Sequence, residues 1–141
     1  MEKIIHILKR KEPNFHTITP NADLTEALNK MCCEDADHLV VMNDEGNFLG
    51  VISEHDITTK ALMMKKPVED LKVKDVMDNK LPMATINDTV ESCMKLLRQH
   101  QARHIAVFEN FSFRGVVTAS DFIDEAVKKR DEIFDTDEEV Y

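Results

Sequence analysis

Two stretches of the sequence place a hydroxyl side chain three residues before an aspartate. In GVISEHDI these residues are Ser53 and Asp56, and in GVVTASDF they are Thr118 and Asp121. A carboxylate at a helix start can accept hydrogen bonds from two adjacent sugar hydroxyls, and the N–H groups there favour an anion. The same residues also fit a helix-capping box, which needs no ligand. The two interpretations are compatible, because a residue can cap its helix while the site is empty.

The segments that precede these pairs are also duplicated. Residues 23–33 and 88–99 each carry apolar side chains at the spacing of one helical face. An aspartate at each start, Asp23 or Asp88, is followed three residues later by a glutamate, which predicts a capping box. The predicted apolar faces consist of Leu24, Ala27, Leu28, Met31 and Cys32 in the first helix, and of Val90, Cys93, Met94 and Leu97 in the second.

Each predicted helix is followed by a short β-rich run, residues 38–42 or 104–108, and then by a turn. The first turn, NDEGN, has Gly46 where a positive φ is needed, whereas the second, ENFSF, has no glycine and must be built differently. Each half therefore reads strand, helix, strand, turn, strand, helix, with a linker near residues 65–77. This alternation predicts an α/β fold. A half of about 65 residues is marginal alone, so we expect the two halves to pack sheet to sheet about a pseudo-twofold axis.

Taken in order, these motifs resemble a pair of CBS domains, known as a Bateman module. The resemblance implies an α/β fold made of two β-α-β-β-α repeats that pack through their sheets with pseudo-twofold symmetry. The motifs that carry it are TITPNADLTEALNKM, HLVVMNDEGNFLGVISEHDI, DVM and HIAVFENFSFRGVVTASDF.

The repeats divide the chain into three expected parts. Residues 1–66 should hold an N-terminal helix and the first repeat, residues 67–130 the second repeat, and residues 131–141 an acidic tail. We expect the tail to be a solvated, frayed end. The N-terminal segment predicts a short amphipathic helix, because apolar residues share one of its faces. Those residues are Ile4, Ile7 and Leu8.

The family resemblance implies that adenine nucleotides or adenosyl compounds bind in clefts between the repeats. It assigns Ser53 and Asp56 to one site and Thr118 and Asp121 to the other. It also implies that a threonine and the β-branched residue after it line the adenine end of each site. The matching residues are Thr17 and Ile18 in the first repeat and Thr85 and Ile86 in the second.

The second of these adenine-end matches is imperfect. Thr85 lies five residues before Val90, whereas Thr17 lies seven before Leu24. A shorter loop would reshape the base pocket of the second repeat. For both threonines, the alternative is an edge strand that exposes its hydroxyl side chain.

The two sites should not be equivalent. The segment before the middle strand is EDAD in the first repeat and HQAR in the second. Carboxylates repel a phosphate, while His100 and Arg103 attract it, so the site at Thr118 and Asp121 should be the better one. Alternatively, Arg103 is a solvated cation at a helix end.

The family often places a basic residue directly before the aspartate, where this chain has His55 and Ser120. The position before each aspartate therefore lacks a fixed cation, although His55 can be charged or neutral near pH 7, and we expect no tight binding of a triphosphate. A monophosphate, a nucleoside or an adenosyl sulfonium then fits as well as a triphosphate.

The composition argues against nucleic acid and membranes as partners. The 141-residue chain has 18 basic and 27 acidic residues, a net charge of −9, which disfavours binding to nucleic acid or to an anionic membrane. No apolar run approaches the roughly 20 residues of a membrane span, and the N-terminal apolar stretch is too short for a signal peptide. Three cysteines, two of them adjacent, favour reduced, packed thiols and a cytoplasmic location.

No catalytic constellation is present in the sequence, so we expect no enzyme activity. There is no Gly-rich phosphate loop, no nucleophile elbow, no resident cofactor motif and no convincing metal-ligand set among the six histidines. The leading hypothesis is a homodimeric regulatory module that binds AMP, ADP, ATP, adenosine or S-adenosylmethionine and signals to an effector protein. The alternative is a dimerising scaffold that has lost nucleotide binding.

Overall fold

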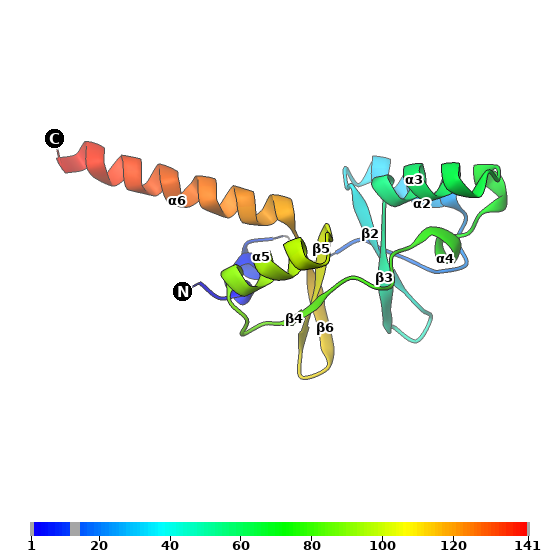
Figure 1. Ribbon diagram of the computed structural model, residues 1–141, viewed down its shortest axis with the longest axis horizontal. Helices are drawn as coiled ribbons and strands as arrows, with labels where there is room; N and C mark the ends of the chain where they lie inside the picture. Colours follow the sequence, from blue (N-terminus) through cyan, green and yellow to red (C-terminus); the bar gives the residue numbers. More distant parts are fainter. Residues whose placement is uncertain (1, 12–14, 141) are drawn as a thin grey trace. The chain divides into compact units, whose positions relative to one another are not determined.

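The computed structural model describes the backbone of residues 2–11 and 15–140, with side chains up to residue 130. The described chain divides into two compact units. One comprises residues 15–81 and the other combines residues 2–11 with residues 82–140. Each contains one three-stranded sheet with helices around it (Figure 1).

The first repeat forms the unit of residues 15–81. Its sheet has the order β1-β2-β3, with β1 parallel to β2 and β2 antiparallel to β3. Its elements are β1 (Thr17–Ile18), α2 (Leu24–Cys33), β2 (His38–Met42), β3 (Phe48–Ser53), α3 (Glu54–Met64), the 3-10 helix η1 (Val68–Asp70) and α4 (Val73–Val76).

The second repeat has the same topology, with the sheet order β4-β5-β6. The predicted α/β fold with two β-α-β-β-α repeats is therefore confirmed. The packing of the repeats through their sheets and the domain boundaries at residues 66 and 130 stay predictions. The elements of this unit are α1 (Ile4–Arg10), β4 (Met83–Thr85), α5 (Val90–Gln99), β5 (His104–Glu109), β6 (Ser112–Thr118) and α6 (Ala119–Val140).

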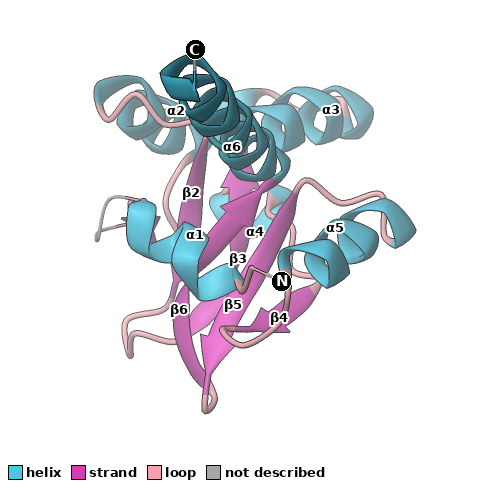
Figure 2. Ribbon diagram, turned by 90° about the vertical axis from the view of Figure 1, so that its left-hand side faces the viewer, coloured by secondary structure: helices cyan, strands magenta, loops and turns pink. Residues whose placement is uncertain are grey.

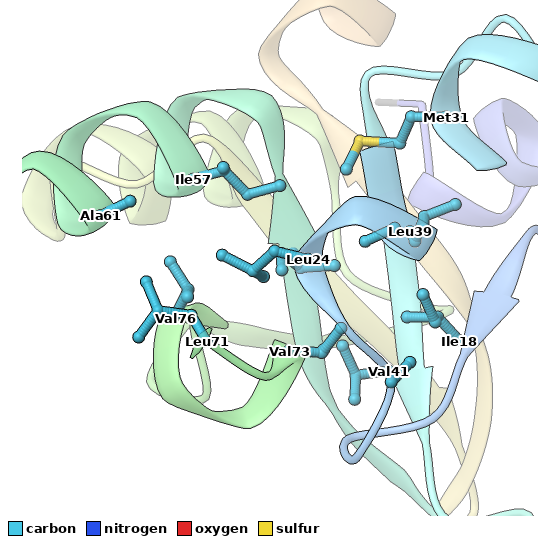
Figure 3. Close-up of a cluster of buried hydrophobic side chains, with 13 residues drawn as sticks. Ile18, Leu24, Met31, Leu39, Val41, Ile57, Ala61, Leu71, Val73 and Val76 are labelled. Carbon is cyan, nitrogen blue, oxygen red and sulfur yellow. The ribbon is translucent and has the colours of Figure 1, made fainter. Parts of the chain in front are cut away.

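Each unit buries its own apolar core between its sheet and its helices. In the first repeat, side chains of α2, β2, α3 and α4 meet in one cluster (Figure 3). The second repeat has a corresponding cluster from α5, β5, β6 and the start of α6. Such closely packed apolar clusters are the main source of stability in a domain of this size.

Each of the two short helices comes just before one repeat in the sequence but packs in the core of the other. α1 comes just before the first repeat, yet Ile4 and Ile7 are buried in the core of the second. α4 comes just before the second repeat, yet Val73 and Val76 are buried in the core of the first. Figure 2 shows α1 lying over the sheet that contains β5 and β6. The predicted amphipathic helix is thus confirmed, and its apolar face belongs to the second repeat.

The predicted capping boxes of α2 and α5 are wrong. Asp23 makes no capping hydrogen bond, because its carboxylate accepts from the Lys72 ammonium at 2.7 Å. Asp88 accepts the N–H of Thr85 at 2.8 Å instead. The cap of α5 is Thr89, whose hydroxyl accepts an N–H from the first turn.

The predicted apolar faces are confirmed except at their margins. Cys32 and Met94 are exposed, whereas the remaining residues of both faces are buried or half-buried. In each helix the residue just before, Met31 or Cys93, faces the core, so Cys32 and Met94 lie at the edge of the buried face. The expectation of packed thiols therefore holds for Cys93 and is wrong for Cys32 and Cys33, which are exposed.

The two hairpin turns differ as expected. Gly46 has a φ of 83°, in the left-handed region that favours glycine. In the second repeat Asn110 and Phe111 have φ values of 48° and 68°. Two consecutive positive φ angles are characteristic of a two-residue hairpin turn, here built without glycine.

The backbone of residues 131–140 continues α6 as a helix, so the expected frayed end is wrong up to Val140. The acidic side chains of this segment and Tyr141 lie outside the described residues. Among the helices of the described chain, none combines the length and apolar character that crossing a bilayer requires.

Candidate functional site

The hydroxyl and aspartate of the first repeat lie where β3 passes into α3. The buried Ser53 hydroxyl accepts the Asp56 N–H at 3.1 Å and donates to Asp56 Oδ2 at 3.0 Å. The Asp56 side chain is mostly buried. The capping interpretation is therefore confirmed here, and the carboxylate is held in a fixed orientation beside the helix start.

The second repeat builds the same junction between β6 and α6. Thr118 Oγ1 accepts the Asp121 N–H at 3.2 Å, and Asp121 Oδ2 accepts the Thr118 N–H at 2.8 Å. This reciprocal pair is a complete capping box. Each repeat thus places one oriented, half-buried carboxylate at the first turn of its second long helix. The contact of these carboxylates with a sugar stays a prediction.

Each of these carboxylates has a lysine ammonium nearby. Lys11 Nζ lies 2.8 Å from Asp121 Oδ2, and Lys60 Nζ lies 3.8 Å from Asp56 Oδ1. These ammonium groups lie near the aspartates although the directly preceding residues, His55 and Ser120, supply no fixed cation. Lys60 was open to detection from the sequence, because i,i+4 partners share a helical face. Lys11 had no such signal, since 110 residues separate it from Asp121.

The two ammonium groups are held differently. Lys11 Nζ also donates to the main-chain carbonyl of Val116 at 2.8 Å. Lys60 Nζ donates to the carbonyls of Val76 and Met77 at 3.0 Å and 3.3 Å, beside the end of α4. Lys60 is therefore bound chiefly to carbonyl oxygens, whereas Lys11 is shared between a carbonyl and the site carboxylate. His55 and Ser120, which directly precede the aspartates, are both exposed.

The register of β1 and β4 shows that Thr85 is not the equivalent of Thr17. Thr17 pairs with Val40, two residues after the start of β2, and Met83 pairs with Ala106, two residues after the start of β5. Met83 therefore corresponds to Thr17. It also lies seven residues before Val90, so the predicted shortening of the loop is wrong.

With Met83 matched to Thr17, different side chains occupy equivalent positions in β1 and β4. Ile18 is buried in the first core, and its register equivalent is Ala84. Thr85 is exposed near the end of β4, and Ile86 is half-buried against the second core. A ligand contact of Thr17, Ile18, Thr85 or Ile86 stays a prediction.

The predicted phosphate-side residues lie just before the middle strands. His100 directly follows the last residue of α5, and both His100 and Arg103 are exposed. In the first repeat, Glu34 lies 3.6 Å from the His16 ring and Asp37 lies 2.7 Å from the His38 ring. Two of the three EDAD carboxylates therefore have a histidine ring beside them.

The described side chains contain no group of three or more histidine, cysteine, aspartate or glutamate residues that could hold a metal ion. The site therefore consists of an oriented carboxylate, a hydroxyl and an ammonium in each repeat. This set can bind a hydroxylated, anionic small molecule without a metal.

The chain therefore consists of a duplicated α/β unit with a hydroxyl–carboxylate pair at each strand-to-helix junction. The family model described as "CBS domain" matches residues 5–63 and 73–128. The chain therefore belongs to the CBS domain family.

Curated relatives match most of the chain. The homoserine O-acetyltransferase of Methanococcus vannielii is 25% identical over 77% of this chain, and protein MJ1404 of Methanocaldococcus jannaschii is 27% identical over 86%. YlbB of Bacillus subtilis is 29% identical over 68%. The chain spans 21%, 31% and 65% of the lengths of these relatives, respectively.

Solved structures share the fold. The CBS domain protein NE2398 has a TM-score of 0.82 at 29% identity, covering 90% of this chain and 99% of that one. A signal-transduction protein with CBS domains from Burkholderia ambifaria has a TM-score of 0.82 at 22% identity, covering 89% and 94%. CBSX2, solved in complex with AMP, has a TM-score of 0.74 at 18% identity, covering 92% and 99%.

Proposed function

We propose that this chain senses an adenosine-type ligand, with the Asp56 and Asp121 carboxylates binding the sugar hydroxyls. The observation that carries the proposal is the duplicated junction, where a hydroxyl caps each helix start. The carboxylate there accepts the Ser53 hydroxyl in the first repeat and the Thr118 main-chain N–H in the second. Two adjacent hydroxyls of a ribose match the two oxygens of such a carboxylate, and charge-assisted hydrogen bonds are stronger than neutral ones. The AMP complex of CBSX2 makes AMP the first ligand to test.

The two sites should differ in their affinity for phosphate. His100 and Arg103 are basic residues on the phosphate side of the second repeat, and Lys11 adds an ammonium beside Asp121. The first repeat has acidic residues at the corresponding place before β2. The second repeat therefore holds the better site for a phosphorylated ligand.

Ligand binding would reach an effector protein through a change in the arrangement of a homodimer. A ligand can shift such an equilibrium only by its differential affinity for the two arrangements. The second candidate function is a dimerising scaffold without ligand binding. The capping roles of Ser53 and Thr118 favour this alternative, because they explain both residues without any ligand.

Thermal melts separate the two functions. AMP, ADP, ATP, adenosine and S-adenosylmethionine are added to the full chain over a range of concentrations. A binder shows a melting temperature that rises with ligand concentration. Asp121→Ala should reduce the rise for AMP more than Asp56→Ala does. Absence of any rise with all five compounds would favour the scaffold, and a larger loss in Asp56→Ala would contradict the assignment of the better site.

A further inference from the structure

The Asp121 carboxylate of the second repeat is already engaged by protein donors. Its Oδ2 atom accepts from Lys11 Nζ at 2.8 Å and from the Thr118 N–H at 2.8 Å. Lys11 comes from the end of α1, so the ammonium belongs to an element outside the strand-to-helix junction. One carboxylate oxygen therefore has two donors before any ligand arrives.

This arrangement changes what a ligand must offer. A nucleoside brings sugar hydroxyls and an uncharged base, so an ammonium displaced from the carboxylate keeps only the neutral Val116 carbonyl and gains no anionic partner. A phosphorylated ligand brings an anion as well. The ammonium can then exchange the carboxylate for the phosphate, and the carboxylate can bind the sugar hydroxyls.

We propose that Lys11 makes the second-repeat site selective for phosphorylated adenosine ligands over the unphosphorylated nucleoside. This inference rests on the proposed function, because Asp121 must be the carboxylate that binds the sugar. Lys11 then acts as a specificity-determining residue whose ammonium weakens the binding of ligands without an anionic group.

The contacts of Lys11 allow its ammonium to move. The Lys11 side chain is 31% exposed and that of Asp121 is 19% exposed. Both groups are partly exposed, so a phosphate can approach the ammonium from solvent without entering the apolar core. The long, flexible lysine stem can carry the ammonium toward a phosphate while α1 keeps its buried residues in place.

Lys60 of the first repeat provides a matched control. Its side chain is 38% exposed, similar to that of Lys11. Its ammonium, however, lies 3.8 Å from Asp56 and donates to two carbonyls. It therefore leaves the Asp56 carboxylate more accessible to a nucleoside, and it should contribute less to selectivity.

Isothermal titration calorimetry with AMP and adenosine tests the proposal directly, since the two ligands differ only in the phosphate. The full-length chain carries Asp56→Ala throughout, so that the second repeat is measured. With Lys11 present, AMP should bind at least about tenfold more tightly than adenosine. In Lys11→Met, AMP should bind about tenfold more weakly while adenosine binds equally or more tightly, so the preference for AMP should fall by about tenfold or more, and His100 and Arg103 account for any preference that remains.

Two further variants complete the experiment. Lys60→Met removes the same charge outside the second repeat and should keep the preference for AMP. Lys11→Arg should retain most of the preference because the charge remains. Circular dichroism checks folding, and Lys11→Gln replaces the methionine variant if that protein does not fold. An unchanged AMP-to-adenosine ratio without the ammonium would overturn the selectivity and leave the proposed function intact. If the wild-type chain binds neither these two ligands nor the others tested by melting, the proposed function and the selectivity both fail.

Discussion

Val51 and Val116 occupy equivalent places in the two sheets, and their carbonyl oxygens accept different donors. Val51 pairs with the main chain of Asp78 through two hydrogen bonds, of 3.0 Å and 2.8 Å. The Val116 carbonyl accepts the Lys11 ammonium at 2.8 Å. In the first repeat the Val51 carbonyl is therefore bound by the Asp78 backbone, whereas in the second the Val116 carbonyl is bound by the Lys11 side chain, which can move away. This difference gives the two candidate sites unequal environments within otherwise similar repeats.

The backbone pairing beside Val51 requires a glycine next to it. A Cβ atom at Gly50 would lie 2.4 Å from the main-chain oxygen of Asp78. We expect Gly50→Ala to lower the free energy of unfolding by about 2 kcal/mol or more, because a backbone segment must shift. Urea denaturation measures the loss.

Gly46→Ala is the matched control for this substitution. Gly46 has a φ of 83°, but no atom lies within 4 Å of the place that a Cβ atom would take, so only conformational strain opposes alanine. Its cost should be about 1 kcal/mol. An equal or larger loss in Gly46→Ala would show that the approach of Asp78 does not constrain Gly50.

The ends of α2 and α5 suggest a stabilising substitution. Two residues after the last residue of each helix, the backbone adopts the left-handed conformation. These residues are Asp35, with a φ of 51°, and Gln101, with a φ of 48°. The N–H of Ala102 donates to the Leu97 carbonyl at 2.9 Å, as in a Schellman motif, where glycine is the preferred residue. Gln101→Gly should raise the unfolding free energy by about 0.5–1 kcal/mol.

Differential scanning calorimetry measures this effect as a higher melting temperature. Gln99→Gly is the matched control, because Gln99 is the last residue of α5 and lies within the helix. Glycine there should destabilise the protein. A fall in melting temperature for Gln101→Gly would contradict the assignment of strain to this position.

The fold could be predicted because its signals are local and occur twice. Apolar periodicity located α2 and α5, and β-rich runs located the middle strands of both sheets. Two of the errors have long-range causes. Asp23 does not cap α2 because Lys72, 49 residues away, binds its carboxylate. Likewise, nothing near Asp121 in the sequence indicates that Lys11 contacts it from 110 residues away.

The register of β4 was missed for a different reason. Matching Thr85 to Thr17 favoured residue type over spacing, whereas the hydrogen-bonded register follows the spacing to the helix and assigns Met83 to that place. Strand register depends on the alternation of buried and exposed faces, and a short strand carries few residues to define it. A two-residue error keeps the alternation intact, which is why the apolar pattern could not expose it.

The three cysteines should react with thiol reagents in a fixed order. Cys32 and Cys33 are exposed, whereas Cys93 is buried in the second core. Burial, aided by the negative charge of Asp88, raises the pKa of the Cys93 thiol to about 11. Because the thiolate is the reactive form, Cys93 should stay unreactive at pH 8 in the folded protein.

A chromogenic disulfide reagent measures this order. We expect a fast phase from Cys32 and Cys33 and release of the third equivalent only when the chain is unfolded in urea. Cys93→Ala should remove the late equivalent without changing the fast phase. Rapid reaction of Cys93 in the native protein would show that the second core opens on the timescale of labelling.

A group of charged residues links the N-terminal segment around α1 to α6 and should make the free energy of unfolding depend on pH. Glu2 lies 2.7 Å from Lys129 Nζ and 3.3 Å from the Arg10 guanidinium, which also contacts the buried Glu125. The hydrogen bond from Lys129, supported by the charges of Lys129 and Arg10, lowers the pKa of Glu2 below its ordinary value of 4.5. A lowered pKa in the folded state stabilises the protein above that ordinary value, and the contribution is lost as the pH falls through the folded-state pKa.

Glu2→Gln should therefore lower the unfolding free energy at pH 7, and its difference from the wild-type protein should shrink as the pH falls below 4.5. The effect should be small, since the Lys129 side chain is 55% exposed and water screens the pair. Urea denaturation from pH 7 to pH 3 follows the difference. Glu69→Gln, at an exposed residue of η1, is the control and should leave the pH profile unchanged. A difference between Glu2→Gln and wild type that stays constant or grows toward pH 3 would show that the Glu2 carboxylate does not stabilise the contact between α1 and α6.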